Sequence, residues 1–195
     1  MKALVPVLVI LGILAAIFFW GVGINNGLVS KDEIVKREWA NVNTEYQRRY
    51  NLVDNLVQTV KGAAKFEQET LTKVIEARAK ATSVNFTAEQ LTDENLAKFQ
   101  QAQSQMTSAL SRLMVVVEQY PDLKANQNFL ELQNELTRIE NRVAIAVRDY
   151  NTTVQDYNTS VRTFPSSLIA SFRNFPVRPT FQATAGSEIA PKVQF

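Results

Sequence analysis

The sequence of 195 residues contains no cysteine and no histidine. It can therefore form no disulfide bond, no zinc site with thiolate or imidazole ligands, and no Ser-His or Cys-His nucleophile system. A di-metal site of the kind found in helical bundles needs Glu-x-x-His pairs and is excluded for the same reason. We therefore predict that the protein is not an enzyme and binds no metal or cofactor.

Glycine and proline are scarce, with six residues of each, and several of them lie towards the two ends of the chain. The middle of the chain is therefore nearly free of residues that break helices, which is typical of long helices. An excess of charge is lacking as well, since 21 basic and 19 acidic residues are interspersed and leave a net charge of +2. Without a basic patch, nucleic acid is not an expected partner.

The N-terminal stretch lacks charge, since no charged side chain lies between Lys2 and Lys31. Residues 3–24 are almost wholly apolar, and as a helix these roughly 22 residues would reach about 33 Å, enough to cross the core of a bilayer. Trp20, near the end of the run, fits an interfacial aromatic residue. A cleaved signal peptide has a shorter apolar run of roughly 7 to 15 residues. We therefore predict an uncleaved single-pass anchor over residues 1–29.

After the anchor, core positions recur at alternating steps of four and three residues, which is the seam of a coiled-coil-like helix. Ser30 and Glu33 could form a capping box in front of this stripe. We therefore predict a first helix of about 50 residues, roughly 75 Å long, that begins just past the anchor. The positions of the stripe are Val35, Trp39, Val42, Tyr46, Arg49, Val53, Leu56, Val60, Ala64, Leu71, Val74, Arg78 and Ala81.

Two further long helices follow. A cap at Thr92 predicts the start of the second helix, and the Tyr120-Pro121 step predicts its end. A third helix should run from residues 123–128 to Thr163, followed by a short helix over residues 166–172. Because short connections between long helices imply antiparallel neighbours, we predict an all-α fold. In it, the transmembrane helix precedes an antiparallel up-down bundle of three long helices and one short helix over residues 30–172, with an extended tail over residues 173–195.

Several motifs in these helices are specific in combination. They are Asn26-Gly27-Leu28-Val29, Trp39-Ala40-Asn41-Val42, Tyr46-Gln47-Arg48-Arg49, Asn55-Leu56-Val57-Gln58, Tyr120-Pro121-Asp122-Leu123, Tyr150-Asn151, Tyr157-Asn158 and Phe164-Pro165. With them, the sequence closely resembles the LemA family of bacterial membrane proteins. The resemblance implies one N-terminal span followed by a helical bundle, at the bacterial cytoplasmic (inner) membrane. It brings no catalytic residues, because the molecular activity of that family is poorly defined.

Basic residues bear on the side of the membrane that the bundle occupies. Only Lys2 precedes the apolar run, whereas Lys31, Lys36 and Arg37 follow it closely. The positive-inside rule therefore favours a cytoplasmic bundle, by a small margin.

Arg49 occupies a core position of the first stripe. A buried guanidinium group needs a carboxylate from another helix, and Glu135, Glu140 or Asp149 could supply it. Such a pair often fixes the register of packed helices, and we predict that role for it. A site for a ligand or a lipid phosphate is the alternative.

Tyr150-Asn151-Thr152 is repeated one heptad later as Tyr157-Asn158-Thr159. The spacing predicts a repeated packing layer in which tyrosine faces inward and asparagine lies at its edge.

The tail places aromatic residues among prolines. Phe175, Phe181, Val193 and Phe195 are its candidate partner-binding residues, and the terminal Val193-Gln194-Phe195 has the alternate apolar spacing that strand-adding peptide-binding domains capture. Such a segment can fold back along a groove, lie at the membrane surface or bind a partner. A terminus that merely packs locally is the simplest alternative.

These features favour a non-enzymatic, membrane-anchored scaffold or adaptor. Its partners would be the lipid bilayer and an unidentified membrane or membrane-associated protein, to which it would present helix faces and the tail. The alternative is a self-assembling, membrane-organising protein that forms homo-oligomeric arrays or rings. The apolar stripes of the long helices could pair between molecules as well as within one.

Overall fold

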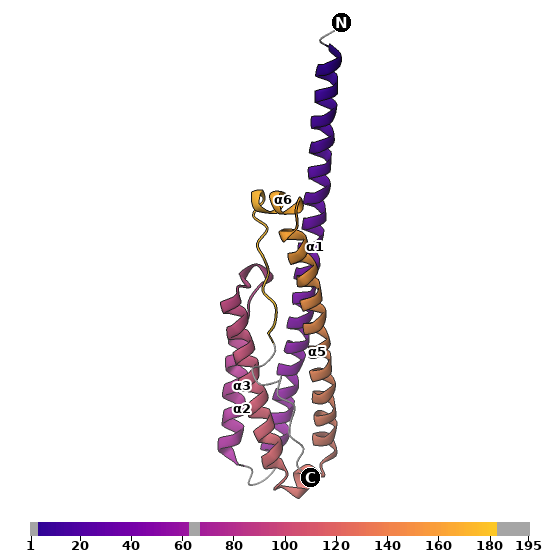
Figure 1. Ribbon diagram of the computed structural model, residues 1–195. Helices are drawn as coiled ribbons and strands as arrows, with labels where there is room; N and C mark the ends of the chain where they lie inside the picture. Colours follow the sequence, from indigo (N-terminus) through magenta and orange to yellow (C-terminus); the bar gives the residue numbers. More distant parts are fainter. Residues whose placement is uncertain (1–3, 63–66, 183–195) are drawn as a thin grey trace, which may run out of the picture.

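A computed structural model describes residues 4–62 and 67–182, and in these ranges the chain forms helices and no strand. The first helix, α1 (Leu4–Lys61), has 58 residues and runs without a break from the apolar N-terminal stretch into a bundle (Figure 1). The other helices are α2 (Gln68–Ser83), a 3-10 turn η1 (Ala88–Gln90), α3 (Asp93–Val117), α4 (Pro121–Lys124), α5 (Gln127–Arg162) and α6 (Ser166–Phe172).

The helices alternate in direction, which confirms the predicted antiparallel up-down bundle. α1 packs along α5, and α2 packs along α3 as a second pair beside them (Figure 1). The cap predicted at Thr92 also forms, since Thr92 Oγ1 accepts a hydrogen bond from the backbone N–H of Asn95 at 3.2 Å, whereas the capping box predicted at Ser30 does not, because α1 is continuous there. Asn126 caps α5 in the same way through the N–H of Phe129. The short helix lies at residues 166–172, as predicted.

The predicted first helix was wrong at both ends. It does not begin at Ser30, because the chain is already helical from residue 4 onward. It does not continue to Ala81 either, because α1 ends at Lys61 and α2 returns antiparallel to it. Gly62 is the local signal for this end, since glycine is favoured just past a helix C-terminus. The heptad stripe crosses the turn because both helices face one core, and heptad spacing reports only which side chains face it.

Aromatic side chains form the centre of the core. Trp39 of α1 lies 5.4 Å from Phe99 of α3 and 5.6 Å from Tyr150 of α5, measured between ring centroids. Its indole Nε1 donates a 2.8 Å hydrogen bond to the backbone oxygen of Phe86, in the connection before η1. The buried side chain of Trp39 therefore connects α1 to α3, to α5 and to the connection before η1.

The N-terminal part of α1 projects out of the bundle as a single exposed helix (Figure 1). Among the described helices it is the one long and apolar enough to cross a membrane, with a mean hydropathy of 2.7 over its most apolar window. Glycines 21, 23 and 27 lie where it enters the bundle, and glycine weakens a helix interior. Residues of α6 and just after it support α1 here. The side chain of Ile169 packs against Gly21, and Arg173 Nε donates to Asn25 Oδ1 at 3.2 Å.

Candidate functional site

Residues 175–182 form an extended segment that runs between α5 and the pair of α2 and α3 (Figure 1). The chain reverses direction after α6 at Asn174, which adopts the left-handed conformation with φ 54°, one that asparagine tolerates better than most residues. The N–H of Phe175 then bonds to the backbone oxygen of Ala170 at 2.9 Å. The segment runs back along α5 in the opposite direction, so the described part of the tail folds back along the bundle, and residues 183–195 lie outside the described residues.

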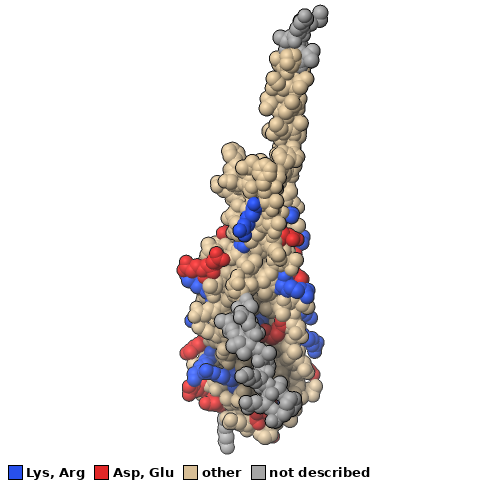
Figure 2. Space-filling view, viewed as in Figure 1, with Lys and Arg blue, Asp and Glu red and all other residues tan. Residues whose placement is uncertain are grey.

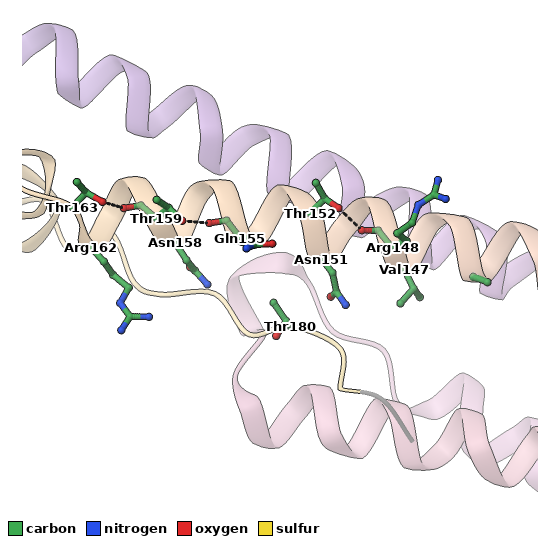
Figure 3. Close-up of a pocket in the computed structure, with 11 residues that line it drawn as sticks. Val147, Arg148, Asn151, Thr152, Gln155, Asn158, Thr159, Arg162, Thr163 and Thr180 are labelled. Atoms are coloured by element: carbon green, nitrogen blue, oxygen red, sulfur yellow. Dashed lines mark hydrogen bonds between the residues drawn. The ribbon is translucent and has the colours of Figure 1, made fainter. Parts of the chain in front are cut away.

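Two asparagines of α5 bind the backbone of this segment, and Figure 3 shows both on the side of α5 that faces it. Asn158 Nδ2 donates to the oxygen of Arg178 at 2.8 Å, and Asn158 Oδ1 accepts from the N–H of Arg178 at 2.8 Å. Asn151 makes the same reciprocal pair with Phe181, at 3.1 and 2.9 Å. Each carboxamide thus satisfies both backbone groups of one residue, as a neighbouring β-strand would.

The tyrosines of the same repeat bind the prolines of the segment. The hydroxyl of Tyr157 donates to the backbone oxygen of Pro176 at 2.9 Å, and that of Tyr150 donates to the oxygen of Pro179 at 3.1 Å. Proline has no N–H, so its oxygen is the only backbone group it can offer. Both rings are buried, which agrees with the predicted inward orientation of the tyrosines.

The heptad repeat and the extended segment match in length. Seven helical residues rise about 10.5 Å, and three extended residues span about 10 Å. Steps of seven along α5 therefore meet steps of three along the segment, from Pro176 to Pro179 and from Arg178 to Phe181. The third residue of each repeat, Thr152 or Thr159, donates instead to a backbone oxygen of α5 itself.

Arg178 is the charged group of the segment, and only 7% of it is exposed. Its Nη2 and Nε lie 2.8 and 3.2 Å from Asp32 Oδ1 on α1, and its Nη1 donates to the backbone oxygen of Ala88 in η1 at 2.8 Å. Sequence reasoning missed this pair. The signal was present in Asp32, which lies three residues before Val35 and so continues the heptad stripe backward with a buried carboxylate.

The aromatic end of the segment packs into the core. The ring of Phe181 lies 5.6 Å from that of Tyr150 and 6.1 Å from that of Trp39. Phe175 is half-buried and packs against the same core. Val193 and Phe195, the other residues predicted to bind a partner, lie outside the described residues.

The structure brings Arg49 and Glu140 together. Arg49 is buried, its Nε lies 2.8 Å from Glu140 Oε1 on α5, and its Nη2 donates to Thr107 Oγ1 on α3 at 2.7 Å. Glu135 and Asp149, the other candidates, pair with neighbours on their own helix, Arg138 and Arg148. Arg49 therefore connects three helices, which is the geometry expected of a group that fixes helix register.

Beside the segment, α5 borders an open groove of about 890 Å³ (Figure 3). Among the described residues, its lining contains two arginines and no acidic side chain. Burial raises the pKa of Tyr46 and of Tyr150 to about 12, so both phenols stay protonated further into the alkaline range than an exposed tyrosine. The groove is lined by Ala144, Val147, Arg148, Asn151, Thr152, Gln155, Asn158, Thr159, Arg162, Thr163 and Thr180.

Comparisons with known proteins identify a family and individual relatives. The model of the LemA family matches residues 38–195. The chain is 25% identical over 153 residues to a protein named Protein LemA from Metamycoplasma hominis, covering 78% of this chain and 66% of that protein. It is also 25% identical over 174 residues to magnetosome proteins MamQ 1 and MamQ 2 from Paramagnetospirillum magneticum, covering 80% of this chain and 64% of each. The chain thus spans just under two thirds of the length of these relatives.

Proposed function

This chain belongs to the LemA family, and we propose that it is a non-enzymatic scaffold or adaptor, anchored in the membrane by α1, that presents the surfaces of its bundle to partner proteins. The partners are membrane or membrane-associated proteins. No catalytic role is assigned, since the chain lacks histidine and cysteine altogether.

The observation that carries this proposal is the continuity of α1. One helix forms both the apolar span and a full-length member of the bundle, so no linker separates the anchor from the domain. From Val22 to Lys61 this helix rises about 58 Å. A bundle joined in this way is held at a fixed height and orientation, which suits a scaffold.

The surfaces available for partners follow from the site. Residues 173–182 are bound by the bundle, so Phe175 and Phe181 serve the fold, and partner binding by the tail is assigned to the part beyond Gln182, including Val193 and Phe195. The outer faces of the helices and the end of the bundle far from the span are the other surfaces.

We place the protein in the bacterial cytoplasmic membrane as a single-pass protein with its bundle on the cytoplasmic side. The basic residues that follow the span, Lys31, Lys36 and Arg37, support this orientation through the positive-inside rule.

Self-assembly into arrays or rings is the second candidate and has less support. Away from the span and residues 164–172, the exposed large apolar side chains of the described residues are scattered over several elements, as on ordinary soluble surfaces. They are Val29, Ile75, Val115, Leu130, Ile145 and Val177.

The test is to cross-link the full-length protein in its native membrane, solubilise it in mild detergent and determine the mass of the complex. A control chain in which residues 1–29 carry an unrelated helical bundle reports the proteins that the span alone collects. A stoichiometric second protein, absent from the control, is expected. A large assembly of this chain alone would favour the membrane-organising alternative, and an uncomplexed monomer would contradict both.

A further inference from the structure

The most concentrated exposed apolar surface outside the span lies on α6 and the turn before it. Phe164, Leu168 and Phe172 are 76%, 63% and 85% exposed. Leu168 and Phe172 are four residues apart on α6, so they lie on one side of that helix, and with Phe164 in the turn before it they form an exposed apolar stripe. Exposed apolar side chains grouped in this way on one short element mark an interaction site.

The opposite side of α6 holds it in place. Ala170 is buried against the bundle, and Ile169 packs beside Gly21 of α1. Ala170 lies on the side of α6 opposite Leu168 and Phe172, whereas Ile169 lies beside them, so the stripe faces away from the bundle and flanks the contact with α1. Figure 1 shows α6 lying across the end of the bundle from which the span emerges.

The position of α6 along α1 coincides with the end of the apolar span. α6 touches α1 at Gly21, one residue after Trp20, and tryptophan is enriched where a span leaves the bilayer. On the face shown in Figure 2, no Lys, Arg, Asp or Glu is visible between α6 and the grey N-terminal atoms. On this face, therefore, no charged side chain separates α6 from the span.

The charges around α6 suit a lipid surface. Arg162 and Arg173 are exposed and bracket an uncharged stretch over residues 163–172. Basic side chains beside an apolar stripe are the pattern of elements that lie in the interface of anionic membranes. Arg173 also donates to Asn25 of α1, which keeps its charge at the level where the span ends.

We propose that α6 is an interfacial foot that inserts Phe164, Leu168 and Phe172 into the boundary between headgroups and acyl chains of the leaflet from which the bundle projects. This inference rests on the membrane anchoring by α1 in the proposed function. It adds a second membrane contact, which fixes the tilt and rotation of the bundle and supports the glycine-containing part of α1.

The test uses the absence of native cysteine. Full-length variants Leu168→Cys and Phe172→Cys are labelled with an environment-sensitive fluorophore and reconstituted into vesicles of equal parts phosphatidylcholine and phosphatidylglycerol, with a nitroxide on the upper acyl chain as quencher. Val115→Cys is the matched control, because Val115 is apolar, 67% exposed and located near the far end of α3. We expect quenching at positions 168 and 172 to exceed that at position 115 several-fold.

A third label separates this inference from its premise. Phe18→Cys lies within the span and must be quenched if α1 crosses the bilayer. Quenching at position 18 without quenching at 168 and 172 overturns the interfacial foot alone, whereas absence of quenching at all of these positions overturns the membrane anchor as well. Disulfide-linked dimers of the unlabelled Leu168→Cys variant, with no quenching by lipid, would assign the stripe to a second copy and also overturn it.

Discussion

Arg178 and Asp32, 146 residues apart in the sequence, form a buried ion pair that fastens the segment after α6 to the first helix. Removing the arginine takes away the hydrogen-bonded partner of the buried Asp32 carboxylate and leaves it with the half-exposed Lys36, at 3.3 Å. We expect Arg178→Ala to lower the free energy of unfolding by about 3 kcal/mol or more. Thermal unfolding of the full-length protein in detergent measures this.

The matched control for that variant is Arg148→Ala, because Arg148 is exposed and pairs only with its neighbour Asp149. Its effect should stay within about 0.5 kcal/mol. Equal effects of the two substitutions would show that the Arg178 pair contributes no more to stability than a surface charge.

Asn158 should protect the backbone amide of Arg178 from hydrogen exchange. Asn158→Ala removes both hydrogen bonds to Arg178, and at about 1 kcal/mol for each bond the exchange of this amide should accelerate tenfold or more. Thr159→Ala is the control, because Thr159 bonds only to its own helix. Hydrogen exchange followed by mass spectrometry over residues 173–182 distinguishes the two, and unchanged protection in Asn158→Ala would refute the pairing.

The bundle should lose stability at alkaline pH. The ordinary pKa of a tyrosine is 10.0, and burial raises that of Tyr46 and of Tyr150 to about 12. Between these values the unfolded state binds fewer protons than the folded state, so the free energy of unfolding falls as pH rises. The slope is about 1.4 kcal/mol per pH unit for each phenol, and this stability is fully present below pH 10.

Tyr150→Phe isolates one of these phenols. It should lower stability by about 1 kcal/mol at neutral pH, through loss of the hydrogen bond to Pro179. The substitution should also make the free energy of unfolding fall less steeply between pH 10 and 12, by the contribution of one phenol. Denaturant unfolding at several pH values measures both, and an unchanged slope would exclude a raised pKa at Tyr150.

The pair of Arg49 and Glu140 should show energetic coupling. A double-mutant cycle with Arg49→Met and Glu140→Gln should give an interaction energy of about 1 to 3 kcal/mol, because the guanidinium group is buried. The exposed pair of Lys98 and Glu94, at 2.7 Å, serves as control and should give less than about 0.5 kcal/mol. Coupling as weak as the control would remove the assigned role in helix register.

Sequence periodicity predicted the parts of the molecule that depend on burial. The stripe with Trp39 identified residues that face the core, and the Arg49 position indicated a buried charge that needs a partner. Periodicity could not choose Glu140 among three carboxylates, because that choice depends on how the helices are aligned. It also could not locate the turn after Lys61, since α1 and α2 share one core.

The candidate site was predictable only in part. The tyrosines of the repeat were expected to face inward, but the asparagine contacts with Arg178 and Phe181 depend on where a distant segment lies. That placement follows from matching a step of seven residues on a helix to a step of three on an extended chain. The sequence of the helix or of the segment alone does not reveal this match. The role of the exposed residues of α6 likewise depends on where α6 contacts α1, which only the structure shows.

The claim on which the proposed function depends most is that the anchor and the bundle form one rigid body. Spin labels at Phe18→Cys in the span and Val115→Cys near the far end of α3, measured by pulsed electron paramagnetic resonance in lipid nanodiscs, test it directly. A flexible Gly-Ser-Gly insertion after Gly27 provides the hinged control. The account predicts one narrow distance distribution that broadens in the control, and a broad distribution in the uninterrupted chain would contradict it.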